Sequence, residues 1–224
     1  MKNKDKVVWI TGASSGIGKA TAKLLLEYGY VVYASAKKKE KIMDLKRLGA
    51  HILLTDINKD GDIQSGLAEI IANEGRIDIL INSGKFGLLE AIDGAPILEA
   101  KPKLDSSVFG LARLSQMVLP YMRRQKSGKI VMISSVFNKR KVGLSGWYNA
   151  SRYALKALSS SISKEVLPLG IDVMLIEPED VKSDWSAIAA ENLNKISEGK
   201  SYSKLVEQFW HHQRRPSQKL LSQA

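Results

Sequence analysis

The sequence predicts a doubly wound α/β domain, in which a parallel sheet is flanked by helices. Short runs rich in β-branched residues alternate with longer runs of helical periodicity, which indicates right-handed crossovers between parallel strands. Each strand run is largely apolar, as expected when helices cover both faces of a sheet. The expected strands are Val7–Thr11, Val31–Ser35, His51–Thr55, Ile77–Ile81, Lys129–Ser134 and Ile171–Ile176. The expected helices are Ile17–Tyr28, Glu40–Leu48, Ile63–Glu74, Ala100–Met122 and Ala150–Leu167.

Length and composition place the chain among ordinary globular proteins. Its 224 residues suit one domain, and the absence of cysteine excludes disulfides, cysteine-ligated zinc and thiol nucleophiles. The first apolar run, Val7–Gly12, is too short for the core of a signal peptide or for a membrane span. We therefore expect a soluble, cytoplasmic protein that does not insert into a membrane.

The net charge of +11 has two interpretations. A basic surface is typical of proteins that bind nucleic acid or acidic membranes, but scattered lysines and an attraction for an anionic cofactor explain the same charge. The basic clusters at 37–39, 123–124 and 139–141 are small and spread along the chain. No recognition helix or aromatic-rich strand accompanies them, so we favour the second interpretation and predict no nucleic-acid partner.

A glycine-rich turn, Thr11–Gly18, follows the first strand and opens the first helix. Gly12 permits the tight turn, Gly16 lets the backbone approach a pyrophosphate, and Gly18 lets the helix pack close to the sheet. The amino end of the helix offers N–H groups to the phosphates. With its G-x-x-x-G-x-G spacing, the turn resembles that of the short-chain dehydrogenase/reductase family of Rossmann-fold oxidoreductases. A tight turn without a ligand is the alternative.

The resemblance implies the remainder of a dinucleotide site. Besides the glycines, the implied cofactor-binding residues are Ser14, Ser15, Ile17, Lys37, Asp56, Ile57, Asn82, Tyr148, Arg152 and Val181. An acidic residue at the end of the second strand would favour NAD(H), whereas this chain has Lys37 there. The positive charge suits a 2′-phosphate, so NADP(H) is expected over NAD(H). Asp56 matches the family's aspartate beside the adenine ring, although such residues are often only turn or cap residues.

The resemblance also implies a catalytic set for hydride transfer between nicotinamide and a carbonyl or secondary alcohol. Tyr148 lies at the position of the family's acid/base tyrosine, and Ser135 lies upstream at the family's spacing, where it would polarise the substrate oxygen. Arg152 replaces the family's lysine one helical turn after Tyr148, and it keeps the charge without usefully releasing a proton. Ser107 replaces a helix asparagine that supports a water relay. No metal site is predicted, because the adjacent His211 and His212 would face different directions on a helix.

Four substitutions fall on this one predicted site, namely Lys85, Ser107, Arg152 and Glu179. Losing interactions made mainly in the transition state lowers a rate by powers of ten. Three hypotheses follow: a weakened NADP(H)-dependent oxidoreductase, a pseudoenzyme that binds the dinucleotide as a sensor or scaffold, and a degraded copy that folds poorly. We favour the first.

The resemblance covers roughly Lys6 to Ser186, so residues 1–186 are expected to form the dinucleotide-binding domain. Residues 187–224 are polar and helix-prone, and the stretch Trp185–Leu193 is amphipathic enough to cover an apolar substrate. No strand pattern follows Ile171–Ile176, so the family's seventh strand is expected to be missing and this strand to form a sheet edge. A homodimer or homotetramer is implied by the resemblance alone.

Overall fold

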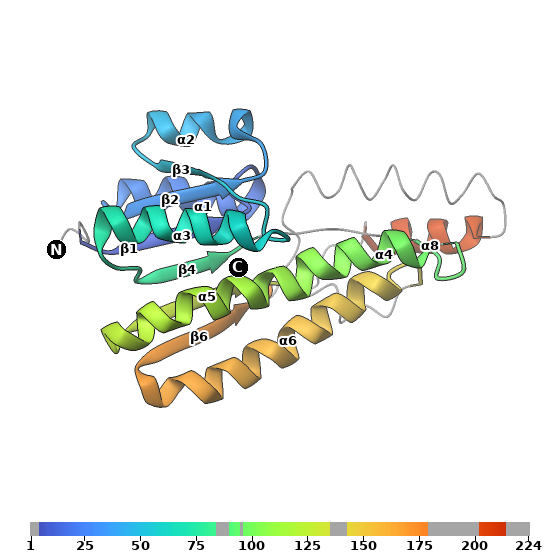
Figure 1. The fold of residues 1–224 in the computed structure, drawn as a ribbon. Coiled ribbons are helices and arrows are strands. Elements are labelled where there is room, and N and C mark those ends of the chain that lie inside the picture. Colours follow the sequence, from blue (N-terminus) through green and yellow to red (C-terminus); the bar gives the residue numbers. More distant parts are fainter. Residues whose placement is uncertain (1–4, 84–89, 95, 135–142, 179–201, 214–224) are drawn as a thin grey trace, which may run out of the picture.

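Six parallel strands form one sheet in the order β3-β2-β1-β4-β5-β6 (Figure 1). The computed structural model describes residues 5–83, 90–94, 96–134, 143–178 and 202–213, the last five by backbone alone. The strands are β1 Val7–Thr11, β2 Val31–Ala36, β3 His51–Leu54, β4 Ile79–Asn82, β5 Gly128–Ile133 and β6 Ile171–Ile176. The chain runs outward from β1 to β3 and then returns to β4 on the other side of β1. This reversal confirms the doubly wound fold and places a switch point between β1 and β4.

Helices cover both faces of the sheet. Figure 1 shows α3, α5 and α6 in front of the strands, with α1 behind them. The longer helices are α1 Gly16–Glu27, α2 Met43–Arg47, α3 Asp60–Glu74, α4 Ile97–Leu104, α5 Gly110–Gln125, α6 Gly146–Val166 and α8 Ser203–Gln213. Short helical turns are η1 Lys39–Ile42, η2 Asp105–Phe109, which is a π-helix, and η4 Leu167–Leu169.

Strand β1 shows how the sequence divides the core between these faces. Val7 and Trp9 pack in the cluster beneath α3 and α5, whereas Val8 and Ile10 pack in the cluster beneath α1 and α2. All four side chains are at most 1% exposed, and burial of each contributes about 1.5–3 kcal/mol. The indole Nε1 of Trp9 donates a hydrogen bond of 3.1 Å to Ser35 Oγ, so the buried ring leaves no unpaired donor.

Of the expected elements only β1 and β6 have the same bounds in the structure, and two of the differences have an identifiable cause. Strand β4 begins at Ile79 rather than Ile77, because the Gln125 side chain takes both backbone groups of Ile77. In place of the single helix expected over Ala100–Met122, the structure has a longer helical segment from Ile97 to Gln125, which the π-helix η2 interrupts. Figure 1 shows α4, η2 and α5 as one continuous rod beside α6.

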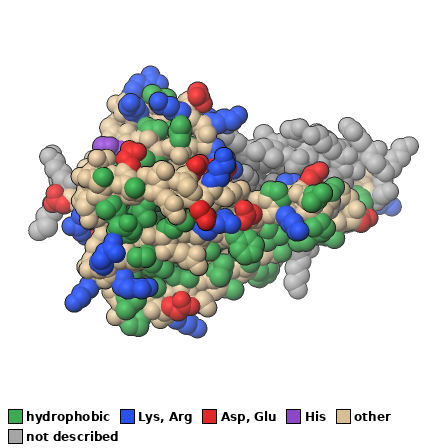
Figure 2. Space-filling model, in the orientation of Figure 1, with side chains coloured by type: hydrophobic (Ala, Val, Ile, Leu, Met, Phe, Trp, Pro, Cys, Tyr) green, Lys and Arg blue, Asp and Glu red, His purple; other side chains and the backbone are tan. Residues whose placement is uncertain are grey.

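Strand β6 is the outer strand on its side of the described sheet, and whether a seventh strand follows it lies outside the described residues. Met174 and Ile176 of β6 remain 39% and 45% exposed. The helix expected in the polar C-terminal region is present as α8, whereas the expected substrate lid at Trp185–Leu193 lies outside the described residues. Figure 2 shows hydrophobic side chains along the surface formed by α5 and α6. None of the helices in the described ranges combines the length and the apolar character needed to cross a bilayer.

Candidate active site

The carboxyl ends of three neighbouring strands bring buried polar side chains to one edge of the sheet. The strand register pairs Thr11 of β1 with Asn82 of β4, and Ser134 directly follows β5. All three side chains are at most 1% exposed. Thr11 Oγ1, both amide atoms of Asn82 and Ser134 Oγ have no hydrogen-bond partner among the described residues. Because unpaired buried polar groups are costly, this edge is prepared to receive a polar ligand.

The glycine-rich turn lies at the same edge, and its backbone needs glycine at several positions. Gly12 and Gly16 have positive φ angles of 66° and 53°, which favour glycine. A Cβ on Gly18 would lie 2.5 Å from the carbonyl oxygen of Gly12, so only glycine lets α1 approach β1 this closely. No side chain caps the amino end of α1 at Ser15, and no acidic residue occupies its first turn. The expected residues Ser14 and Ile17 are also partly exposed in this turn.

An ion pair joins the ends of the second and third strands. Lys37 Nζ lies 2.9 Å from Asp56 Oδ1, a contact that the sequence analysis did not anticipate. Burial raises the pKa of Asp56, but the Asn58 backbone N–H and the Lys37 ammonium outweigh burial and hold this pKa below its usual value. The neighbouring Ile57 is buried at 6% exposure. The ammonium group of Lys37 therefore lies at the edge of the site, beside the residues expected to contact the adenine.

Ser107 is carried by the π-helix η2 and is only 1% exposed. The Gly110 backbone N–H donates to the Asp105 carbonyl oxygen five residues earlier, which defines the wide turn. Pro102, one turn upstream, supplies no backbone donor. Such turns occur frequently at functional sites, and this one turns Ser107 towards α6.

Tyr148 and Arg152 lie one turn apart near the beginning of α6. The Arg152 guanidinium carbon is 5.1 Å from the centre of the Tyr148 ring, and the two side chains are 0% and 5% exposed respectively. Arg152 Nε donates to Ser151 Oγ at 3.2 Å, but Nη1 and Nη2 have no partner among the described residues. Burial lowers the pKa of Arg152, and the nearby Tyr148 opposes that shift. A buried guanidinium whose two Nη atoms have no partner among the described residues suits a ligand with anionic or hydroxyl oxygens.

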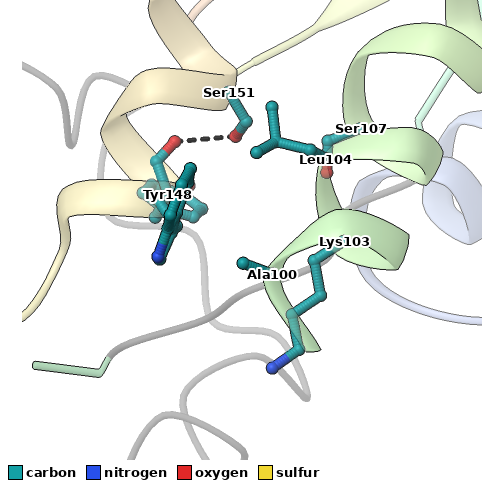
Figure 3. Close-up of a pocket in the computed structure, with 7 residues that line it drawn as sticks. Ala100, Lys103, Leu104, Ser107, Tyr148 and Ser151 are labelled. Atoms are coloured by element: carbon teal, nitrogen blue, oxygen red, sulfur yellow. Dashed lines mark hydrogen bonds between the residues drawn. The ribbon is translucent and has the colours of Figure 1, made fainter. Parts of the chain in front are cut away.

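A small hollow brings two of the expected catalytic residues together (Figure 3). It is lined by Ala100, Lys103, Leu104, Ser107, Trp147, Tyr148 and Ser151. Ser107 comes from η2, whereas Tyr148 comes from α6, so the hollow joins the two helices. Its volume of about 10 Å³ admits a single water molecule at most.

Other expected residues lie outside the described part of the chain. These are Ser135, Val181 and two of the substituted positions, Lys85 and Glu179. Lys156, one helical turn after Arg152, instead pairs with Glu177, its Nζ lying 3.5 Å from Glu177 Oε2. The sequence analysis missed Thr11 and Ser134 as edge groups, although their positions at strand ends beside Gly12 and Ser135 were a usable signal.

Comparisons with known proteins agree with this geometry. The family model for short chain dehydrogenases matches residues 6–194. A 3-ketodihydrosphingosine reductase from Bacteroides thetaiotaomicron is 33% identical over 181 residues, which are 81% of this chain and 66% of that protein. A probable short-chain type dehydrogenase/reductase, VdlC, from Helicobacter pylori is 34% identical over 82% of this chain and 68% of its own length. The chain thus spans about two thirds of these curated relatives.

Two solved structures share the fold. A short-chain dehydrogenase from Streptomyces avermitilis has a TM-score of 0.74 and 34% identity, over 77% of this chain and 65% of that one. A metagenomic short-chain oxidoreductase in complex with NADP has a TM-score of 0.75 and 26% identity, over 81% and 85%.

The doubly wound sheet, with its glycine turn at the switch point, defines a dinucleotide-binding α/β protein. More particularly, the chain belongs to the short-chain dehydrogenase/reductase family of Rossmann-fold oxidoreductases.

Proposed function

We propose that the protein is an NADP(H)-dependent oxidoreductase that acts on a carbonyl or a secondary alcohol, with a rate reduced by its altered site. One observation carries the proposal. Nη1 and Nη2 of the fully buried Arg152 have no hydrogen-bond partner among the described residues, and the same holds for polar side-chain atoms of Thr11, Asn82 and Ser134. Such a concentration of unpaired buried groups, in a family of nicotinamide-dependent oxidoreductases, is best explained by a bound dinucleotide.

The residues present fit that cofactor. Gly12 and Gly16 take positive φ angles in the turn, Gly18 lets α1 approach β1 closely, and the uncapped amino end of α1 supplies donors and a favourable dipole. Lys37 would hold the 2′-phosphate, with Asp56 and Ile57 beside the adenine. Its ion pair with Asp56 fixes the ammonium at the strand edge. Asn82 would contribute at the nicotinamide end, and Val181 is proposed to do so from outside the described residues.

Within the site, each chain residue has a distinct proposed task. The cofactor, when bound, supplies or accepts the hydride. Tyr148 gives the proton to the substrate oxygen in reduction and removes it in oxidation. Ser135 orients that oxygen by a hydrogen bond. Arg152 keeps a positive charge beside the Tyr148 ring and offers Nη1 and Nη2 to ribose hydroxyls, but it does not pass the proton onward.

Ser107 would hold the water in the hollow that it shares with Tyr148. A serine hydroxyl is shorter than an asparagine amide, so this water is held less firmly than in relatives with asparagine. Together with Arg152, this explains a reduced rate rather than a different reaction.

The experiment that tests the proposal begins with a titration of the protein with NADPH and, separately, NADH. We expect tighter binding of NADPH. Gly18→Ala is the control for the site, because its Cβ would collide with the Gly12 carbonyl and should remove most NADPH binding from a protein that still melts cooperatively. No binding by the parent protein would refute the proposal.

Turnover is then measured on a panel of ketones and aldehydes. The panel includes long-chain 3-keto compounds, since the Bacteroides relative is a 3-ketodihydrosphingosine reductase. Arg152→Lys combined with Ser107→Asn should raise the rate. If cofactor binds but neither protein turns over any substrate, the pseudoenzyme hypothesis replaces the enzyme.

We also propose that two copies associate through the surface of α5 and α6. Phe109 and Tyr153 on this surface are 58% and 56% exposed, and exposed aromatic residues are enriched at protein interfaces. In contrast, Leu111, Leu114 and Val118 are fully buried against the sheet and are core residues. Sedimentation equilibrium tests the assembly, and a monomer at all concentrations would refute it.

A further inference from the structure

We infer that Asn58 is a positioning residue, which holds the π-helix η2 so that Ser107 faces Tyr148. The inference rests on the proposed function, because it concerns the efficiency of the proposed reaction. It arises from a hydrogen bond between the loop after β3 and a turn 48 residues later, where Asn58 Nδ2 donates to Ser106 Oγ at 2.7 Å. Ser106 immediately precedes Ser107 and is itself only 3% exposed.

The loop that carries Asn58 is fixed by its own hydrogen bonds. The Asn58 backbone N–H donates to Asp56 Oδ1 at 3.1 Å, and the Asp56 backbone N–H donates to Asp62 Oδ2 at 2.9 Å. Asp62 belongs to the first turn of α3. The side chain of Asn58 therefore projects from a braced support rather than from a free loop.

Ser106 is held from two sides. Its hydroxyl accepts from Asn58 and donates to the Pro102 carbonyl oxygen at 3.0 Å, so both contacts share one oxygen atom. The Asn58 contact spans separate elements, whereas the Pro102 contact lies within the same rod. Because Ser106 and Ser107 are consecutive, a rotation of η2 that breaks the Asn58 contact also moves Ser107.

Close packing at the end of η2 supports the same conclusion. A Cβ on Gly110 would lie 3.0 Å from both the carbonyl oxygen and Cγ1 of Ile57, so the beginning of α5 sits tightly against the residue before Asn58. Arg113 adds a more exposed link, with Nε 3.1 Å from Asp60 and Nη2 3.1 Å from Asp105. Exposed ion pairs contribute little, so the part-buried Ser106 contact and the packing of Gly110 against Ile57 are the stronger links between η2 and this loop.

This arrangement links the two ends of the proposed site. Residues 56–58 lie where the adenine is expected, and the same segment contacts the turn that carries Ser107. A serine that must hold one water in a hollow of about 10 Å³ tolerates little displacement. The contact thus compensates in part for the shorter side chain at position 107.

The test compares Asn58→Ala, Ser106→Ala and the double variant with the parent protein. We expect each single variant to lower kcat about tenfold to a hundredfold, while the KM for NADPH changes less than about twofold. The double variant should lose no more than Ser106→Ala alone, because that variant already lacks the Asn58 contact; any excess of Ser106→Ala over Asn58→Ala reports the lost bond to the Pro102 carbonyl. Ser106→Ala removes a single oxygen atom, so it can test the contact if Asn58→Ala folds poorly.

Asn73→Ala is the matched control. Asn73 Nδ2 also donates to a hydroxyl from a distant strand, that of Tyr33 at 3.2 Å, but it lies away from the proposed site. Its loss should leave kcat unchanged. A weaker NADPH interaction with unchanged kcat in Asn58→Ala would overturn the inference, because Asn58 would then serve the adenine end alone.

Amide hydrogen exchange provides a readout that does not need turnover. The Gly110 N–H closes the π-helix, so its exchange should accelerate about fivefold or more in Asn58→Ala and Ser106→Ala, but not in Asn73→Ala. If the parent protein turns over no carbonyl, the proposed function fails, and unchanged Gly110 exchange would separately refute the Asn58 contact. Active parent protein with unaltered kcat in both variants would refute the positioning role alone.

Discussion

The two ends of the central sheet treat their buried polar groups in opposite ways. At the amino end, Asp78 accepts hydrogen bonds from Lys6 Nζ at 3.0 Å, the Val7 backbone N–H at 2.9 Å and the Arg76 guanidinium at 2.6 Å and 2.9 Å. Gln125 likewise occupies both backbone groups of Ile77. This end of the sheet satisfies its polar groups internally.

At the carboxyl end, Thr11, Asn82, Ser134 and Arg152 are as deeply buried but leave side-chain atoms unpaired among the described residues. Leaving these atoms unpaired is unfavourable, and a ligand that forms hydrogen bonds with them would offset this free energy. The amino end thus maintains the fold, whereas the unpaired groups at the carboxyl end fit the proposed binding of a dinucleotide.

Tyr148→Phe tests the carboxyl end of the sheet and should produce the largest effect. Losing the proton donor should lower turnover about 10²-fold to 10⁴-fold, because general acid–base catalysis has that magnitude. The midpoint of thermal unfolding and the NADPH Kd should change little. Steady-state oxidation of NADPH measures the rate. Unchanged turnover would show that Tyr148 is not the acid.

Asp78→Ala acts at the amino end and should instead lower stability. The change leaves Arg76 and Lys6 without their carboxylate and removes a bond to the β1 backbone, so we expect a loss of about 3 kcal/mol in the free energy of unfolding. Urea denaturation measures it. The folded fraction should bind NADPH as the parent does. A selective loss of binding would contradict the claim that the amino end serves stability alone.

Acid should remove part of that stabilisation. Burial raises the pKa of Asp78, but Arg76, the Val7 N–H and Lys6 outweigh it and lower this pKa below the usual 3.8. A carboxyl group whose pKa is lowered by folding stabilises the protein above its unfolded pKa, and this contribution disappears as pH falls through the folded value. The stability difference between the parent and Asp78→Asn should therefore shrink as pH falls below 3.8. A constant difference would contradict the assignment.

Arg152→Met should have a smaller effect of opposite sign on the cofactor-free protein. Replacing a buried cation that has no acidic partner among the described residues by an apolar side chain of similar length should raise the free energy of unfolding by about 1–2 kcal/mol. The same variant should lose the stabilisation that NADPH gives the parent. Thermal melts with and without NADPH measure both. Lower stability without cofactor would mean that Arg152 supports the fold, as Asp78 does.

Lys37→Met should have the smallest effect. Because Lys37 is 44% exposed, its pairing with a phosphate should contribute modestly, and NADPH affinity should fall about threefold to fivefold while NADH affinity stays unchanged. Paired titrations measure the ratio. An equal fall for both cofactors would mean that Lys37 acts through Asp56 rather than on the 2′-phosphate.

Local sequence determined most of the fold. The bounds of β1 and β6 follow directly from their apolar runs, and the glycine-rich turn predicts the helix that follows it. The predicted start of β4 at Ile77 was wrong, because Gln125, which is distant in sequence, binds both backbone groups of Ile77. Periodicity along one segment contains no information about such a competitor.

The candidate site was predictable only where one residue type and its spacing suffice. Tyr148 and Arg152 are four positions apart on one helix, so their proximity follows from helical geometry. The π-helix at Ser107 was not predictable, because it depends on Asn58 and Ile57 from another part of the chain. The Lys37–Asp56 pair joins neighbouring strands and likewise required the assembled sheet.

The position of β6 at one edge of the described sheet bears on how concentrated solutions of the protein should behave. Its exposed Met174 and Ile176 lie on the outermost described strand, where backbone groups can attract a second molecule. A net charge of +11 drives molecules apart, but dissolved ions limit that repulsion to about 10 Å at roughly 0.1 M ionic strength. Dilute buffers therefore favour separate particles, whereas added salt favours cohesion along this strand.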